Sequence, residues 1–293
     1  MAKKTNQQNQ TKDYFDKSAK EWQKKSNSLN IKIPVIQQRN SFVFDHVKKS
    51  KNKIKKFLDV GCGTGELVYQ ISKRNIFSIG IDFSEKMIDN CNKYSNKNTQ
   101  FICTDILNYK SDMKFDLISA NGFIEYISLI ELNKFLKNTK KILKKNGHLI
   151  FSVRNRLFNI FSLNKFTEPE LKLSTSNKLL NESLFFSNIE KFKSLEKLPK
   201  IDFQNKNFSH THTGIGVASR FQYTPSQINR ILSKHKFQII DLAGVNTHIL
   251  PRNLVHKNKE KNQMYFDINQ PFIFGSLSNI PFSSTFMVKA KSC

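Results

Sequence analysis

The pattern of apolar and polar residues predicts alternating strands and helices in the first half of the chain. A short, mostly apolar run over 57–60 ends in three glycines that alternate with other residues, at positions 61, 63 and 65. Apolar residues then return at helical spacing between Glu66 and Lys73. We interpret this stretch as a strand, a tight turn and a helix.

Further apolar runs predict the other strands of a single sheet. We expect a helix over 136–145, and strands near 78–82, 98–106, 114–122, 147–153, 237–243 and 284–290. Another helix is expected to begin at Thr224 and to end near His235. Pro225 would occupy its first position, and Gln227 would complete a capping box with Thr224.

The length and the cysteine content limit the class of protein. At 293 residues the chain can bury a full core, so one large domain is expected. No window reaches the roughly 18 apolar residues of a membrane span, and residues 1–8 lack the apolar segment of a signal peptide. We therefore expect a soluble, cytoplasmic protein. The four cysteines show no metal-ligand spacing, so no metal is expected.

The formal net charge of +25 raises the question of a nucleic-acid partner. Only seven of the 48 basic residues are arginine, however, and the lysines are spread through every segment among asparagines. Arginine is the usual residue for bidentate contacts with bases and phosphates. Scattered lysine is more typical of a bias toward AT-rich codons, and we do not expect a nucleic-acid partner.

The glycine turn and one acidic residue predict a site for a nucleoside. Glycine is needed where φ is positive or where a Cβ would collide with a ligand, and three in five positions indicate close approach. Asp82 follows Gly65 by 17 positions and is expected at the tip of the next strand, where it can accept hydrogen bonds from a ribose diol.

These residues resemble motifs I and II of the class I S-adenosylmethionine (SAM) methyltransferases. Residues 98–106, ending in an acidic position, and residues 114–122 resemble the next two strands of that family. The resemblance extends over about a hundred residues and implies SAM as the cofactor. The cofactor-binding residues that it implies are Asp59, Gly61, Cys62, Gly63, Gly65, Asp82, Phe83, Met87, Asp105, Ile106, Asn121 and Gly122.

The resemblance also implies the fold and excludes some acceptors. We expect an α/β fold with a seven-stranded Rossmann-like sheet in the order 3-2-1-4-5-7-6, the last strand antiparallel and helices on both faces. Residues 119–123 lack the proline turn of enzymes that methylate the exocyclic amines of bases, and no Pro-Cys nucleophile is present. Residues 122–127 instead resemble the small-molecule branch, with Tyr126 in place of its usual histidine.

We divide the expected single domain by its place in the fold. Residues 12–50 resemble the N-terminal helices that cover SAM in ubiquinone-type enzymes. The SAM-binding half is 51–153, and a closing half is 223–293. Two insertions, 154–222 and 246–281, leave the C-terminal strand ends where ligands bind in such sheets, so we expect them to form the acceptor chamber.

Several residues are candidates for contacts with the acceptor. Arg154 and Arg156 alternate on an extended segment and can clamp a carboxylate, phosphate or acidic sugar, although surface neutralisation is an equal alternative. Either His210 or His212 is our candidate for a general base. A zinc site would need two further ligands, and nothing in the sequence supports His248 and His256 as that completion. Pocket residues are also expected at Tyr126, Tyr14 and Trp22, with core packing as the alternative for the last two.

The sequence thus favours a SAM-dependent methyltransferase that acts on oxygen, with nitrogen less favoured, of a polar small molecule or sugar. The preference for a surface-glycan pathway comes from resemblance of residues 152–156, with the long insertion that follows, to methyltransferases of polysaccharide clusters. A quinone-pathway O-methyltransferase is the first alternative. An RNA-binding or RNA-modifying protein and a SAM-binding regulator remain further alternatives. The oligomeric state is left open.

Overall fold

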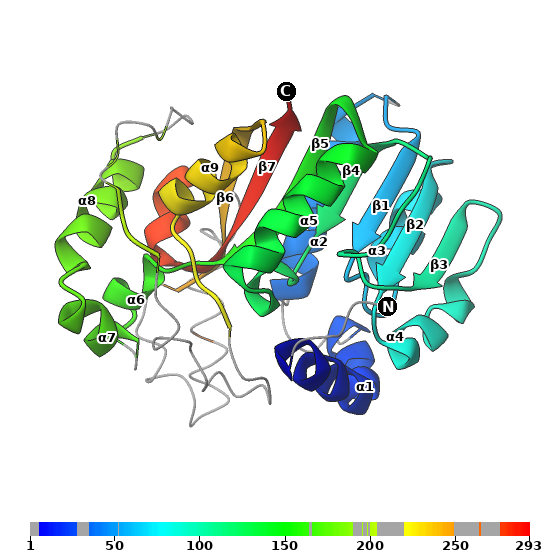
Figure 1. The fold of residues 1–293 in the computed structure, drawn as a ribbon, viewed down its shortest axis with the longest axis horizontal. Coiled ribbons are helices and arrows are strands. Elements are labelled where there is room, and N and C mark those ends of the chain that lie inside the picture. Colours follow the sequence, from blue (N-terminus) through cyan, green and yellow to red (C-terminus); the bar gives the residue numbers. More distant parts are fainter. Residues whose placement is uncertain are drawn as a thin grey trace.

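The computed structural model describes residues 6–27, 35–51, 53–163, 166–189, 195, 198, 200–203, 220–248, 264 and 276–293, with side chains for all of these but 6, 7 and 21–27. A seven-stranded sheet forms the centre of the described part (Figure 1). Its strands are β1 (Lys56–Val60), β2 (Phe77–Asp82), β3 (Thr99–Cys103), β4 (Phe115–Ala120), β5 (Leu143–Arg154), β6 (Phe237–Thr247) and β7 (Ser283–Ser292).

The strand order is β3-β2-β1-β4-β5-β7-β6, which confirms the expected topology. Neighbouring strands among β1 to β5 pair in parallel. Strand β7 runs antiparallel to both β5 and β6, as predicted. The carboxyl ends of β1 to β5 therefore meet at one edge of the sheet, and the order reverses beside β1.

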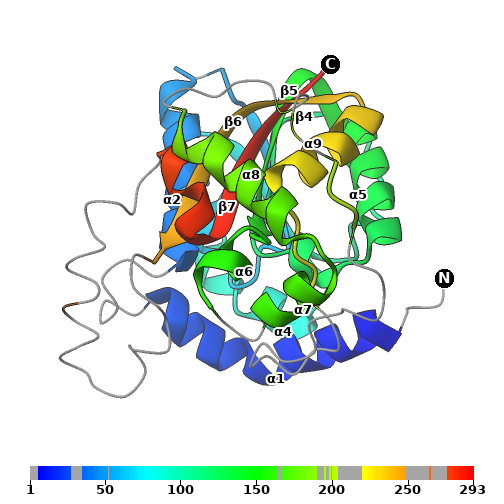
Figure 2. The same cartoon turned by 90° about the vertical axis from the view of Figure 1, so that its left-hand side faces the viewer.

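Alternate residues of the strands pack into two separate cores, because successive side chains of a strand point to opposite faces. Phe57 belongs to the core shared with α2 (Val35–Lys49) and α3 (Glu66–Ser72), whereas Leu58 belongs to the core shared with α5 (Leu129–Ile142) and α9 (Pro225–Lys234). Figure 2 shows α2 and α5 on opposite sides of the sheet. The sheet is thus covered on both faces, as expected for a parallel α/β fold.

The helix α1 (Asn6–Asn27) lies beneath the arrowheads of β1 and β2 in Figure 1, and Figure 2 shows it at the same end. Asp16 of α1 accepts a hydrogen bond from the Ser84 hydroxyl, which caps α4 (Glu85–Asp89). The hydrogen bond ties α1 to the loop after β2. The predicted N-terminal helices are therefore α1 and α2.

Local capping explains one correct and one incorrect helix prediction. The helix α9 begins as predicted, with Thr224 as N-cap, Pro225 at its first position and a capping box through Gln227. The helix predicted over 136–145 is wrong in its bounds, since α5 begins at Leu129 and β5 follows directly from Leu143. A second capping box, between Ser128 and Glu131, starts this helix and was not recognised.

Besides α4, three short helical elements lie outside the first insertion among the described residues: η1 (Asn92–Tyr94), η2 (Ile124–Tyr126) and η6 (Leu277–Phe282), which extends one residue beyond the second insertion. The described part of the first insertion forms α6 (Phe158–Phe161), α7 (Thr167–Lys172) and α8 (Ser176–Ser187). These helices lie beyond β6 and β7, at the left of Figure 1. Leu179 and Phe186 of α8 are buried in the α5-side core, so much of this insertion stabilises the fold.

Candidate active site

The turn after β1 has the backbone geometry that only glycine adopts easily. The φ angles of Gly61, Gly63 and Gly65 are 68°, 54° and 84°. A left-handed conformation costs another residue about 1–2 kcal/mol. Ile81 of β2 holds the turn in place, because its carbonyl accepts from the backbone N–H groups of Gly61 at 2.8 Å and Cys62 at 3.0 Å.

Two of these glycines serve different purposes. A Cβ added to Gly63 would meet nothing within 4 Å, so Gly63 leaves open space in front of the turn. A Cβ added to Gly65 would lie 2.9 Å from the ring of Phe101 and 3.0 Å from Cys91 Sγ. Gly65 is therefore required for packing behind the turn, whereas Gly63 allows a ligand to approach the backbone.

Asp82, at the end of β2, organises the same turn. Its Oδ2 accepts from the Gly63 N–H at 3.0 Å, and its Oδ1 accepts from the Ser84 N–H at 2.9 Å. Burial raises the pKa of the Asp82 carboxyl to about 6, although these backbone donors oppose the shift. A buried carboxylate at this position can accept further hydrogen bonds from a hydroxyl-bearing ligand.

Asp59 of β1 lies beside Asp82 and is also buried. Its carboxylate accepts a hydrogen bond from the Ser119 hydroxyl on the neighbouring strand β4. Burial raises the pKa of Asp59 to about 7, and the nearby Asp82 charge adds to the rise. Two carboxyls held in low dielectric favour a positively charged ligand at this place.

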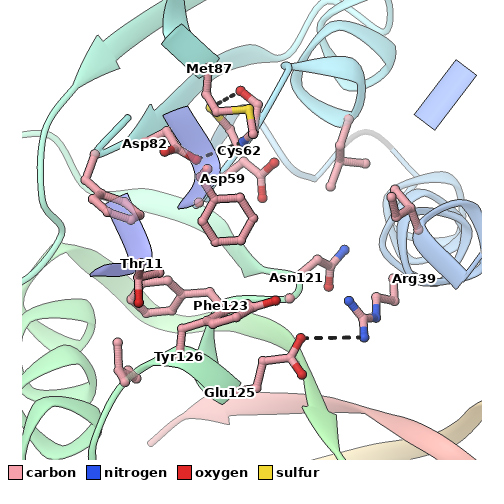
Figure 3. Close-up of a pocket in the computed structure, with 18 of the residues that line it drawn as sticks. Thr11, Arg39, Asp59, Cys62, Asp82, Met87, Asn121, Phe123, Glu125 and Tyr126 are labelled. Atoms are coloured by element: carbon pink, nitrogen blue, oxygen red, sulfur yellow. Dashed lines mark hydrogen bonds and ion pairs between the residues drawn. The ribbon is translucent and has the colours of Figure 1, made fainter. Parts of the chain in front are cut away.

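These residues line one cavity of about 320 Å³ at the carboxyl ends of the parallel strands. Figure 3 shows Asp59, Asp82 and Met87 at one end and Glu125 and Arg39 at the other, with Asn121 and Phe123 between them. We call these the acidic end and the arginine end. Every cofactor residue predicted from the sequence lines the cavity except Gly65 and Ile106; the lining set is Asp59, Gly61, Cys62, Gly63, Asp82, Phe83, Met87, Asp105, Asn121 and Gly122.

The arginine end is built around the buried Glu125, in η2. Its carboxylate lies 2.5 Å from Arg220 Nη2, 3.9 Å from Arg154 Nε and 4.0 Å from Arg39 Nη2. Burial raises the pKa of Glu125, but the three arginines outweigh burial and hold that pKa below its usual value. Glu125 is therefore ionised at neutral pH.

The structure brings two of the predicted acceptor residues into the cavity and separates two others from it. Arg154 and Tyr126 line the arginine end. Arg156, in contrast, forms a buried bidentate pair with Glu170, with contacts of 2.9 Å and 2.7 Å, and Tyr14 packs edge-on against Phe15. The expected clamp required the strand to continue through residue 156, because residues two apart on a strand share a face. Strand β5 ends at Arg154, so Arg156 is free to turn away toward Glu170.

Three predicted residues fall where nothing can be said of their side chains. His210 and His212 lie outside the described residues, as does the side chain of Trp22. Of the described residues in the two insertions, Arg154, Arg220 and Asn246 line the cavity. The described helices α6, α7 and α8 contribute none of its lining, so among the described residues the insertions reach the cavity only at their ends, and the acceptor chamber stays a prediction.

Sequence reasoning missed Arg39, Arg220 and Glu125. Each comes from a different segment: Arg39 from α2, Arg220 from the residues before α9 and Glu125 from η2. The one signal available was the scarcity of arginine, since three of the seven arginines in this lysine-rich chain line the cavity. Lysine is the compositional default here, so an arginine is the more informative residue.

The described residues contain neither a metal-ligand cluster nor a membrane-spanning helix. No cluster of three or more histidine, cysteine or acidic side chains is arranged there to hold a metal ion. Among the helices in the described ranges, none combines the length and the apolar character that crossing a membrane requires.

Comparison with known proteins gives the family. A family model described as a methyltransferase domain matches residues 51–214, which is more than half of the chain. The chain therefore belongs to this methyltransferase family, and the resemblance to class I SAM-dependent enzymes is confirmed.

Relatives and solved structures agree with this assignment. The ubiquinone biosynthesis O-methyltransferase of Coxiella burnetii is 32% identical over 113 residues, which cover 37% of this chain and 47% of that protein. The chain thus matches about half the length of such relatives. The crystal structure of magnesium protoporphyrin IX methyltransferase from Synechocystis PCC 6803 with bound S-adenosylhomocysteine (SAH) aligns with a TM-score of 0.58 at 13% identity. The alignment covers 98% of this chain and 100% of that one, and it shows a common fold.

Proposed function

We propose that the protein is a SAM-dependent methyltransferase that methylates an oxygen atom of a polar small molecule or sugar. The observation that carries the proposal is one cavity with two chemically different ends. The acidic end fits the cofactor, and the arginine end would hold the acceptor. A cavity of this kind brings two reactants together without a dedicated catalytic group.

The residues of the acidic end fit SAM one by one. Asp82 would accept from the ribose hydroxyls, and the open space at Gly63 would admit the methionyl part. Phe83, Met87 and Leu107 offer apolar contacts for an adenine ring, with Asp105 beside them. Asp59 and Asp82 together would favour the net positive charge of SAM.

SAM supplies a sulfonium methyl group, which passes to the acceptor oxygen as the carbon–sulfur bond breaks and leaves SAH. The protein has to orient the acceptor and exclude water. Orientation of this kind can contribute roughly 7–11 kcal/mol. A sugar hydroxyl also needs a base to take its proton, and His212 or His210 stays our prediction for that role.

A quinone-precursor phenol is the second candidate acceptor. The names of the relatives favour it, as does the aromatic wall formed by Phe15, Phe123 and Tyr126 at the middle of the cavity. The ring of Phe15 lies edge-on to that of Tyr126, with centroids 5.3 Å apart. The preference for a surface glycan has no support from this geometry and stays a prediction from the sequence.

Two measurements test the proposal in sequence. Calorimetry with SAM and SAH should show binding of both, and failure of both to bind would overturn it. Purified protein with methyl-labelled SAM should then label an acceptor from a panel of sugars, hydroxy acids, phenols and amines. Label confined to amines would contradict transfer to oxygen, and label confined to phenols would favour the second candidate.

A further inference from the structure

The arginine end of the cavity holds more positive charge than its own residues neutralise. Three guanidinium groups, of Arg39, Arg154 and Arg220, converge on the single carboxylate of Glu125. The side chains are 12%, 18%, 8% and 3% exposed, respectively, so solvent screens them weakly. The group carries a net two positive charges in a nearly closed space.

The backbone fixes this cluster in place. The Phe221 N–H donates to the carbonyl of Glu125 at 2.8 Å, and the Tyr223 N–H donates to the carbonyl of Arg154 at 3.1 Å. Arg39 Nη2 donates to Thr285 Oγ1 of β7 at 3.2 Å. Arg220 also stacks over the ring of Tyr126, 5.3 Å from its centroid. The cations are therefore held together by the fold.

Each guanidinium keeps an unused donor. The Nε atoms of Arg39, Arg154 and Arg220 are buried and have no hydrogen-bond partner. A buried donor that stays unpaired costs about 1–3 kcal/mol, more when it is charged. Among the described lining residues, the other acids, Asp59, Glu66, Asp82 and Asp105, belong to the acidic end and its turn. The arginine end thus contains three cations, each with an unpaired donor, and one carboxylate to neutralise them.

Two anions are available to pair with these three cations. Glu125 pairs with one guanidinium, and the carboxylate of SAM can pair with a second. Arg39 is placed for that second role, because a Cβ on Gly122 would lie 2.9 Å from Arg39 Nη1 and Gly122 lines the middle of the cavity. One buried cation is left without an anion. A buried charge is costly unless it is paired.

We propose that the acceptor is an acid, a small molecule whose carboxylate or phosphate binds between Arg154 and Arg220. This inference rests on the proposed function and narrows its acceptor to an anionic class. Guanidinium forks match both anions through paired N–H donors. The anion would serve as a handle that positions the rest of the acceptor, and Glu125 would set how tightly it is held.

Matched pairs of probes test the inference by binding, with no need to know the natural acceptor. SAH is first titrated into the protein by calorimetry, and the SAH-loaded protein then receives glucose, glucuronate or glucose 6-phosphate, and catechol or 3,4-dihydroxybenzoate. Each acid should bind at least about tenfold more tightly than its neutral partner, the effect of one charge-assisted contact. Comparison of glucuronate with glucose 6-phosphate distinguishes a carboxylate site from a phosphate site.

Two variants give opposite predicted signs. Arg154→Gln should abolish the preference for acids, whereas Glu125→Gln should strengthen acid binding several-fold because a competing anion is lost. Arg74→Gln removes one exposed positive charge far from the cavity lining and is the matched control. It should leave the affinity for acids within about twofold, since surface charge is screened.

The outcomes separate the two proposals. If SAH itself fails to bind, the proposed function fails. If SAH binds but acids show no advantage over neutral partners up to their solubility limits, the acid inference alone is overturned. An acid preference that survives Arg154→Gln, or falls equally in Arg74→Gln, also overturns it. Weaker acid binding in a folded Glu125→Gln protein would show that Glu125 does not compete with the acceptor's anion for the arginines, and this result would also overturn the inference.

Discussion

The two ends of the cavity differ in how the chain assembles them. The acidic end comes from the ends of β1 and β2 and from the loops after β1, β2 and β3. Its named residues, Asp59 to Asp105, lie within one continuous stretch. The arginine end joins segments far apart in the chain: Arg220 meets Glu125 across 95 positions and Arg39 meets Thr285 across 246. The residues of the acidic end form a local sequence motif, whereas those of the arginine end come together only in the folded protein.

This difference has a physical origin. The cofactor site needs a specific backbone shape, and such shapes impose glycine at fixed spacing. The acceptor site needs only charge and position, which side chains from any element that reaches the strand ends can supply. The following predictions test whether the two ends act on different ligands, from the largest expected effect to the smallest.

His212→Ala should leave SAM affinity unchanged and lower the methylation rate by roughly 10²–10⁴, the usual contribution of a general base. The effect would place His212 with the acceptor end. His210→Ala is the control, since alternation on an extended segment points both side chains in the same direction and we expect only one of them to reach the reacting oxygen. Single-turnover rates with the identified acceptor measure both, and unchanged rates in both variants would remove the histidines from the account.

Arg156→Ala should destabilise the fold without affecting the cavity. Arg156 and Glu170 are 1% and 0% exposed, and removal of one partner from such a buried pair costs about 3–5 kcal/mol. Urea unfolding would measure the loss. Arg154→Gln, two positions earlier, should cost much less stability, and equal losses would contradict the division between a structural and a functional arginine.

Gly65→Ala and Gly63→Ala should separate packing from ligand access at the acidic end. Both pay about 1–2 kcal/mol for a positive φ, but only Gly65→Ala also overpacks against Phe101, for a further 1–3 kcal/mol or so. Gly63→Ala should be the more stable of the two variants. Relative to its loss of stability, it should lose more affinity for SAH than Gly65→Ala does. Identical unfolding free energies would show that the added methyl groups meet the same surroundings.

Asp82→Ala should weaken SAM binding by about 10- to 100-fold, the worth of roughly 1.5–3 kcal/mol for hydrogen bonds to a charged group. Part of the loss would come through the turn, because Asp82 also accepts from the Gly63 N–H. Asp82→Asn keeps one acceptor oxygen, so its affinity for SAM should lie between those of the wild type and Asp82→Ala. A dissociation constant that stays at the wild-type value in Asp82→Ala would remove this residue from the cofactor site.

The acidic end should also respond to pH. The pKa values of about 7 for Asp59 and about 6 for Asp82 are above the ordinary 3.8, chiefly because of burial. Between pH 3.8 and these raised pKa values the folded, empty protein therefore binds more protons than the unfolded chain. The stability that these groups contribute declines as pH rises from 3.8 to about 7 and is constant above that. SAM affinity should change in the opposite direction, rising by at most about tenfold per pH unit for each carboxyl as it ionises.

Calorimetry between pH 5 and pH 8 in buffers of matched ionic strength would measure this dependence. Asp82→Asn should flatten it, since the substitution removes one of the two titrating groups. An affinity for SAM that does not vary over this range would show that ionisation of neither carboxyl contributes to binding the positively charged cofactor.

The sequence located most residues of the acidic end for the same reason that it missed most of the arginine end. Glycine spacing and an acid at a strand end are local, and they located Gly63 and Asp82 correctly in the cavity. The strand order followed from the resemblance. The partner of an arginine is not local: Arg154 and Arg156 are alike in sequence, yet one faces Glu125 and the other pairs with Glu170. The position of Glu170 on α7, which only the folded chain fixes, decides between them.

A crystal structure of the protein with SAH bound would test the division of the cavity most directly. The account predicts that the ribose hydroxyls donate to Asp82, that the methionyl chain passes Gly63, and that Arg154 and Arg220 remain open to a second ligand. SAH lying across Arg154 and Arg220, or a ribose that makes no contact with Asp82, would contradict it.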